Sequence, residues 1–86
     1  MGENVAEYVR VSDRKRAVGA ELDELLETRR SYAEMARSMT QNMITDEERA
    51  AILETYNKKV AECDAQAGRL RWQLELLDHE LDELAG

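Results

Sequence analysis

A heptad spacing of apolar residues in both halves of the chain constrains the fold more than any other feature. In the first half, alternating steps of three and four residues join a series of positions in which only Lys15 and Arg29 are charged. The series comprises Tyr8, Val11, Lys15, Val18, Leu22, Leu25, Arg29, Tyr32, Ala36, Met39 and Met43. An average spacing of 3.5 residues is typical of a coiled-coil helix, because it keeps one apolar seam facing a partner helix.

The second half repeats this seam. Its positions are Arg49, Leu53, Tyr56, Val60, Cys63, Ala67, Leu70, Leu74, Leu77, Leu81 and Leu84. Folding one half onto the other pairs Leu22 with Leu70 and Met39 with Leu53, so that the alternating heptad positions meet as an antiparallel pair requires. The sequence therefore predicts an all-α fold, an antiparallel two-helix coiled-coil hairpin. A dimer of long straight helices would use the same pairs, and the pattern leaves both open.

A capping signal marks the predicted turn. Thr45 followed by Glu48 forms a capping box, and Asn42 is expected to end the preceding helix in a left-handed conformation. We predict a single domain over residues 1–86, with helix one at about 4–42, a turn at about 43–46 and helix two at about 46–84. No Pro or Gly enforces the turn, so a continuous helix remains open.

Helix two carries a second apolar stripe that points away from the seam. The stripe consists of Ala61, Ala65, Gly68, Trp72 and Leu76. Small residues permit close helix approach, and a Trp beside a Leu supplies the large anchor that dominates many interfaces. Because two helices bury only the strip where they touch, we expect the hairpin to dimerise into a four-helix bundle or to dock on a protein partner. The predicted function is a non-enzymatic interaction module, such as a small adaptor, chaperone or assembly subunit.

The flanks of the first seam are also partly apolar. Gly19, Leu26 and Ala33 line one flank and Met35 lies on the other, which widens the apolar surface of helix one.

Charge suggests an alternative function. The chain has 12 Lys and Arg against 19 Asp and Glu, a net charge of −7, so we do not expect nucleic-acid binding. Antiparallel folding lays the basic start of helix one beside the acidic end of helix two, with Arg14 facing Glu80. The acidic end could instead act as a small inhibitor or competitor for a nucleic-acid site, of the kind that phages encode. Its residues are Glu75, Asp78, Glu80, Asp82 and Glu83.

Few residues suggest chemistry. The chain has no Gly-rich phosphate loop and no nucleophile elbow, so we expect neither an enzyme nor a cofactor. His79 lies between Glu75 and Glu83 at helical spacing, but all three are predicted to face solvent, and we expect no metal site. Cys63 is predicted to be a small core residue opposite Arg29, with a redox or disulfide role left open.

Lys15 and Arg29 interrupt the first seam. We expect them to extend outward along their stems and to select one helix register, although either could meet a partner's carboxylate.

Location follows from two further observations. No apolar run approaches the roughly 18 residues needed to cross a bilayer, and the first residues lack the order of a signal peptide. We therefore expect a cytoplasmic protein, without membrane contact, whose partner is another copy or a different protein. No residue pattern points to a particular family.

Overall fold

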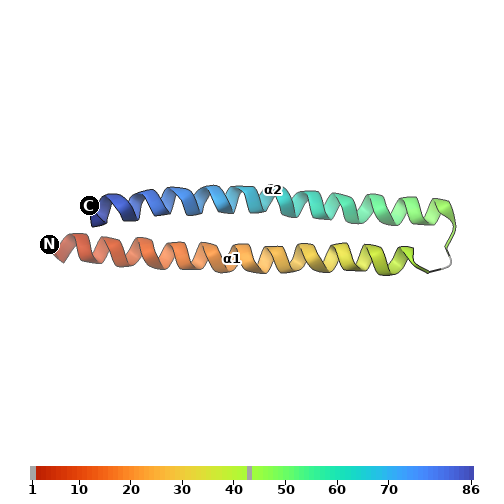
Figure 1. Ribbon diagram of the computed structural model, residues 1–86, viewed down its shortest axis with the longest axis horizontal. Coiled ribbons are helices and arrows are strands. Elements are labelled where there is room, and N and C mark those ends of the chain that lie inside the picture. The colour runs from red at the N-terminus through yellow and green to blue at the C-terminus, as the bar shows by residue number, and fades with distance from the viewer. Residues whose placement is uncertain (1, 43) are drawn as a thin grey trace.

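The computed structural model, which describes residues 2–42 and 44–86, is a helical hairpin. Helix α1 spans Gly2–Thr40 and helix α2 spans Asp46–Ala85. The two helices run antiparallel and side by side, with both chain ends at one end of the molecule and the turn at the other (Figure 1). The result is a rod of 67 × 14 × 12 Å. The all-helical hairpin expected from the two seams is the observed arrangement.

Helix α2 begins where the capping signal predicts. Thr45 is the N-cap residue, and its hydroxyl accepts a hydrogen bond from the Glu48 backbone N–H at 3.1 Å. The same hydroxyl donates to the Glu48 carboxylate at 3.2 Å. Asp46, Glu47 and Glu48 occupy the first turn, where negative charge interacts favourably with the helix dipole. The cap therefore fixes the start of α2 at Asp46.

Helix α1 ends at Thr40, two residues before the predicted end. The Thr40 hydroxyl donates to the carbonyl oxygens of Ala36 and Arg37 at 2.8 and 3.1 Å, and the Gln41 N–H donates to Arg37 at 3.2 Å. No described residue has a positive φ, so the expected left-handed conformation of Asn42 is wrong. Helix α1 thus ends without a left-handed residue. Met43, the last predicted position of the first seam, lies outside the described residues.

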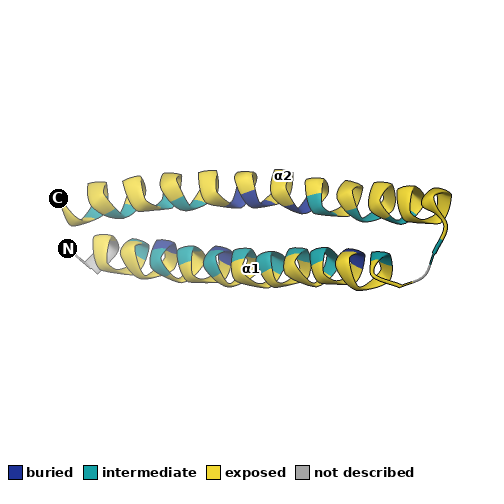
Figure 2. Cartoon of the chain, turned by 45° about the vertical axis from the view of Figure 1, so that its right-hand side comes forward, coloured by how far each residue is buried: buried dark blue, intermediate teal, exposed yellow. Residues whose placement is uncertain are grey.

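The core lies along the two seams, within residues 11–36 of α1 and 63–70 of α2. Its buried side chains are Val11, Val18, Ala36, Cys63, Ala67 and Leu70. These residues face the opposite helix, whereas the outer faces of both helices are exposed along the rod (Figure 2). Toward its ends the seam opens: the predicted partners Met39 and Leu53 keep 40% and 38% of their surface exposed.

Two tyrosines in the seam contact each other across the helices. The rings of Tyr32 and Tyr56 are 6.2 Å apart with their planes inclined by 47°, a separation common for interacting aromatic pairs. The Lys59 ammonium lies 5.4 Å from the centre of the Tyr32 ring, within the range of a cation–π contact. These cross-helix contacts hold the part of the seam that lacks leucines.

Candidate protein-interaction surface

The two charged seam positions reach carboxylates on the other helix. Lys15 Nζ lies 2.5 Å from Asp78 Oδ1, and Arg29 Nε lies 2.6 Å from Asp64 Oδ1. Asp64 directly follows Cys63, the residue predicted to oppose Arg29, and Asp78 directly follows the seam residue Leu77. The pKa of Lys15 is raised by its hydrogen bond to Asp78 and by that carboxylate's charge, and the pKa of Arg29 is raised in the same way by Asp64.

These two ion pairs help to select one helix register. Lys15 and Arg29 are separated by two heptads on α1, and so are Asp64 and Asp78 on α2. Arg71 occupies the corresponding position midway between the two aspartates. A slip by one heptad in either direction would bring a seam cation beside Arg71, and like charges at that distance repel. Sequence reasoning predicted the outward reach of both cations but missed their partners, which the two-heptad spacing could have shown.

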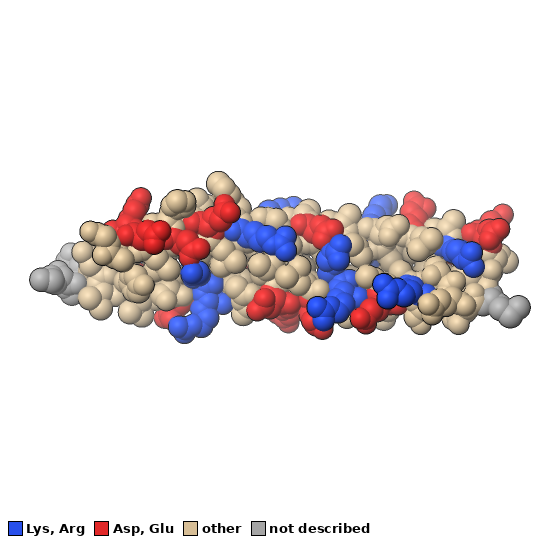
Figure 3. Space-filling view, viewed as in Figure 1, with Lys and Arg blue, Asp and Glu red and all other residues tan. Residues whose placement is uncertain are grey.

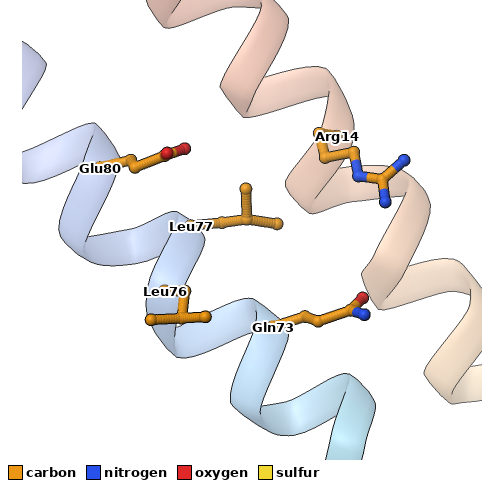
Figure 4. Close-up of a pocket in the computed structure, with 5 residues that line it drawn as sticks. All are labelled: Arg14, Gln73, Leu76, Leu77 and Glu80. Atoms are coloured by element: carbon orange, nitrogen blue, oxygen red, sulfur yellow. The ribbon is translucent and has the colours of Figure 1, made fainter.

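The predicted ion pair between Arg14 and Glu80 is not among those formed by the described residues. Both residues line a groove between the helices together with Gln73, Leu76 and Leu77 (Figure 4). In that groove the Arg14 guanidinium extends away from the Glu80 carboxylate. Two long exposed side chains gain little from pairing in water and lose rotamer freedom, so facing heptad positions do not ensure contact.

The sequence-predicted stripe lies on the face of α2 turned away from α1. Its five members, Ala61, Ala65, Gly68, Trp72 and Leu76, are all exposed. Trp72 keeps 60% of its surface accessible and Leu76 keeps 48%, although both are large apolar side chains. Figure 2 shows this outer face of α2 as exposed from the turn to the C-terminal end. The hairpin therefore leaves the stripe uncovered.

The side chains of the stripe change in size along the helix. Its first three members are small, and a Cβ atom built on Gly68 would meet no other atom within 4 Å. Its last two members are large, and Leu76 continues into the groove between the helices that contains Leu77 and Arg14. The small half allows a second backbone to approach closely, while the large half supplies apolar surface to bury.

The flanks of the first seam contribute less exposed surface. Gly19, Leu26 and Ala33 are half-buried beside the seam, whereas Met35 is 52% exposed. These residues extend the apolar surface of α1 without forming a continuous face.

A second exposed apolar group lies at the open end of the hairpin. Val5, Tyr8 and Val9 of α1 are 64%, 42% and 52% exposed, and they line a groove with Asn4 and Leu84. Sequence reasoning treated Tyr8 as a seam residue and missed Val5 and Val9. Their spacing of four residues beside the start of the seam is the signal that could have found them.

Charged side chains of both signs interleave on the face of the rod seen in Figure 3. The five acidic residues near the end of α2 are all exposed. Among them, Asp78 is already paired with Lys15. The acidic end therefore offers negative charge to solvent, although part of it is neutralised within the hairpin.

Potential reactive groups lie apart from the stripe. Cys63 is buried in the seam with a free thiol, next to Asp64. His79 is exposed, and no group of three metal-binding side chains occurs within residues 2–42 and 44–86. Within the same ranges, no helix has the length and apolar character needed to cross a membrane.

Comparison with protein-family models, with curated proteins and with solved structures found no significant match to this chain. The residues and their geometry therefore carry the functional argument.

Proposed function

We propose that the protein is a non-enzymatic interaction module that binds another protein surface, either a second copy or a different partner, through the stripe on α2. The observation that carries this proposal is the exposure of Trp72 and Leu76 side by side on the outer face of α2. A tryptophan and a leucine one helical turn apart form a compact apolar anchor, and residues of this kind supply most of the affinity at many interfaces.

The shape of the molecule supports a binding role. The rod is only 14 × 12 Å in cross-section, the width of two helices, which leaves little depth for enclosing a small substrate. A long helical surface is instead suited to packing against other helices. Two hairpins that meet along their stripes would bring four helices together in a row, with the two α2 helices in contact and one α1 helix on each outer side.

The test removes the anchor without disturbing the seam. We expect Trp72→Ala to lower the oligomeric mass, or to abolish capture of the partner from the source lysate, because Trp72 contributes little to the hairpin core. Helicity by circular dichroism should stay unchanged. Gln66→Ala is a matched control, since Gln66 is also exposed on α2 but lies outside the stripe. Unchanged mass and an unchanged partner set in the Trp72 variant would reject the proposal.

The exposed acidic end of α2 favours a second candidate, a small acidic inhibitor or competitor for a nucleic-acid site. Glu80, Asp82 and Glu83 are exposed close to the C-terminal end of the helix. Binding that depends on these charges should weaken steeply with salt, because exposed charges are screened at high ionic strength. Replacing the three residues by Gln, Asn and Gln should also weaken binding, as high salt does. Salt-insensitive binding would exclude this candidate and favour the apolar stripe.

A further inference from the structure

We propose that the occupant of the stripe is a second copy of this chain, whose α2 packs antiparallel on α2 across a two-fold axis near Gly68. The inference rests on the proposed function and deepens it, because it names the partner and the contacts. Two observations support it: the amount of surface that the hairpin exposes, and the distribution of large and small residues along the stripe.

The exposed surface is larger than a chain of this size usually keeps. The hairpin exposes 6783 Å². A compact monomer of 9.9 kDa exposes about 5,200 Å², so the excess is about 1,600 Å². A standard interface covers about 800 Å² on each partner, which would remove about half of this excess. The hairpin thus has surface available for a dimer interface, and the stripe contains Trp72 and Leu76, the two most exposed large apolar side chains of α2.

The stripe is complementary to itself when two copies run antiparallel. With the axis near Gly68, Trp72 of one copy lies opposite Ala65 of the other, and Leu76 lies opposite Ala61. Each large side chain then meets a small one, and the two-fold axis repeats both contacts. A parallel arrangement would instead oppose Trp72 to Trp72 and leave a gap between the alanines. The order of residue sizes along the helix therefore favours the antiparallel contact.

Gly68 lies where the two helices would approach most closely. The hairpin does not require a glycine there, because an added Cβ would have no neighbour within 4 Å. Between two crossing helices, the absence of a side chain lets the backbones approach and lets the flanking Trp72 reach the opposite helix. Arg69 lies beside the axis, and its long exposed side chain can carry its charge out to solvent.

The first experiment measures assembly through the stripe itself. Trp72 is the only tryptophan in the chain, so its fluorescence reports on this surface alone. As the protein concentration is increased, we expect the mass from sedimentation to rise from 9.9 kDa to twice that value. Over the same concentrations, the emission of Trp72 should shift to shorter wavelength as the indole is buried.

A chain that stays monomeric at all concentrations would overturn this inference. The proposed function would still be decided separately, by whether Trp72→Ala abolishes capture of a different protein. A dimer that forms without any change in Trp72 emission would also overturn the inference, because association would then use another surface.

The second experiment tests the geometry by exchanging sizes. We expect Trp72→Ala to raise the dimer dissociation constant at least about 100-fold, because each dimer loses two buried indoles. Adding Ala65→Trp to Trp72→Ala should restore most of the affinity, since the large and small residues simply change sides. Adding Ala61→Trp instead should not, because position 61 faces Leu76 of the other copy. Equal recovery, or recovery in neither double variant, would overturn the two-fold contact.

Glycine substitutions provide a test that does not depend on large side chains. Gly68→Ala should raise the unfolding temperature of the dilute monomer, because Ala favours the helix more than Gly does. The same change should weaken the dimer about 10-fold, since it adds two methyl groups between closely packed helices. Gly19→Ala is the matched control: its Cβ also has no neighbour within 4 Å, but it lies on α1. An unchanged dimer affinity in Gly68→Ala would contradict the proposed crossing point.

Discussion

The seam and the stripe of α2 are two apolar faces of one helix with opposite environments. Leu70 in the seam is 7% exposed, whereas Trp72, only two residues later, is 60% exposed. Both faces repeat apolar residues at steps of three and four, and both contain small residues beside large ones. They differ because α1 covers one face and no described part of the chain covers the other. Periodicity thus identifies both apolar faces of α2. The turn places α1 against one of them, and only that face is buried within the chain.

The largest expected difference in stability is between two truncated leucines, one on each face of α2. Leu70→Ala should lower the free energy of unfolding by about 2–4 kcal/mol, because it removes a buried side chain and leaves a cavity. Leu76→Ala should change it by less than about 0.5 kcal/mol when the chain is dilute enough to be monomeric, because Leu76 is already half exposed. Urea denaturation followed by circular dichroism measures both. Equal losses would show that the hairpin buries the two faces alike.

The next effect concerns the turn that lets the chain close its own seam. Thr45→Ala should lower the free energy of unfolding by about 1 kcal/mol, because the Glu48 N–H loses its acceptor at the start of α2. Thr55→Ala is the control, since the Thr55 hydroxyl bonds to the Ala51 carbonyl within an exposed stretch of the helix. It should cause no loss in thermal unfolding. A similar loss in both variants would mean that the cap has no special role in closing the seam.

A smaller effect on stability is expected from the ion pair between Arg29 and Asp64. Asp64→Asn should lower the unfolding temperature slightly at low salt, because Arg29 loses its carboxylate partner. The difference should vanish in about 1 M salt, where charges are screened over about 3 Å. Glu62→Gln removes the same charge from an exposed residue that forms none of the ion pairs of the described chain, and should cause no such decrease. A salt-independent loss in Asp64→Asn would indicate packing rather than charge.

The smallest effect depends on pH. Asp78 raises the pKa of Lys15 above its ordinary value of 10.5 in the folded chain. Such a shift stabilises the fold fully below pH 10.5, and this contribution is lost as the pH rises through the raised pKa. Lys15→Arg keeps its charge over that range, so the native chain should lose thermal stability faster than the variant above pH 10.5. Parallel unfolding curves from pH 8 to pH 12 would contradict a contribution from the Lys15 ammonium.

Much of the hairpin could be predicted because its causes are local. The heptad spacing predicts two helices with facing seams, and Thr45 with Glu48 predicts the start of α2, as the structure confirms. The left-handed conformation predicted for Asn42 was wrong, since α1 ends at Thr40 and no described residue has a positive φ. The exact end of a helix depends on competing hydrogen bonds of similar energy, which residue preferences alone do not resolve.

The contacts of the charged residues were harder to predict for a related reason. Heptad positions alone suggested that Arg14 would pair with Glu80, whereas the structure forms pairs to Asp64 and Asp78. Lys15 and Arg29 start within the seam, so their stems are held by packing before their charges reach the opposite helix. Arg14 starts outside the seam and is free to extend into solvent. Whether the stem of a basic side chain starts inside or outside the seam, and not only the helix register, decided which ion pairs formed between the helices.

The sequence by itself determined the two helices, the cap that starts α2 and the presence of two apolar faces on α2, because these follow from spacing and from hydrogen bonds over a few residues. Only the tertiary structure decided that α1 covers the seam of its own chain, that seam residues such as Val18 and Ala67 are buried more deeply than Met39 or Leu53, and that Trp72 remains accessible. These outcomes depend on how two distant segments share a limited contact area, and a hairpin of two helices has area enough to cover only one face of each.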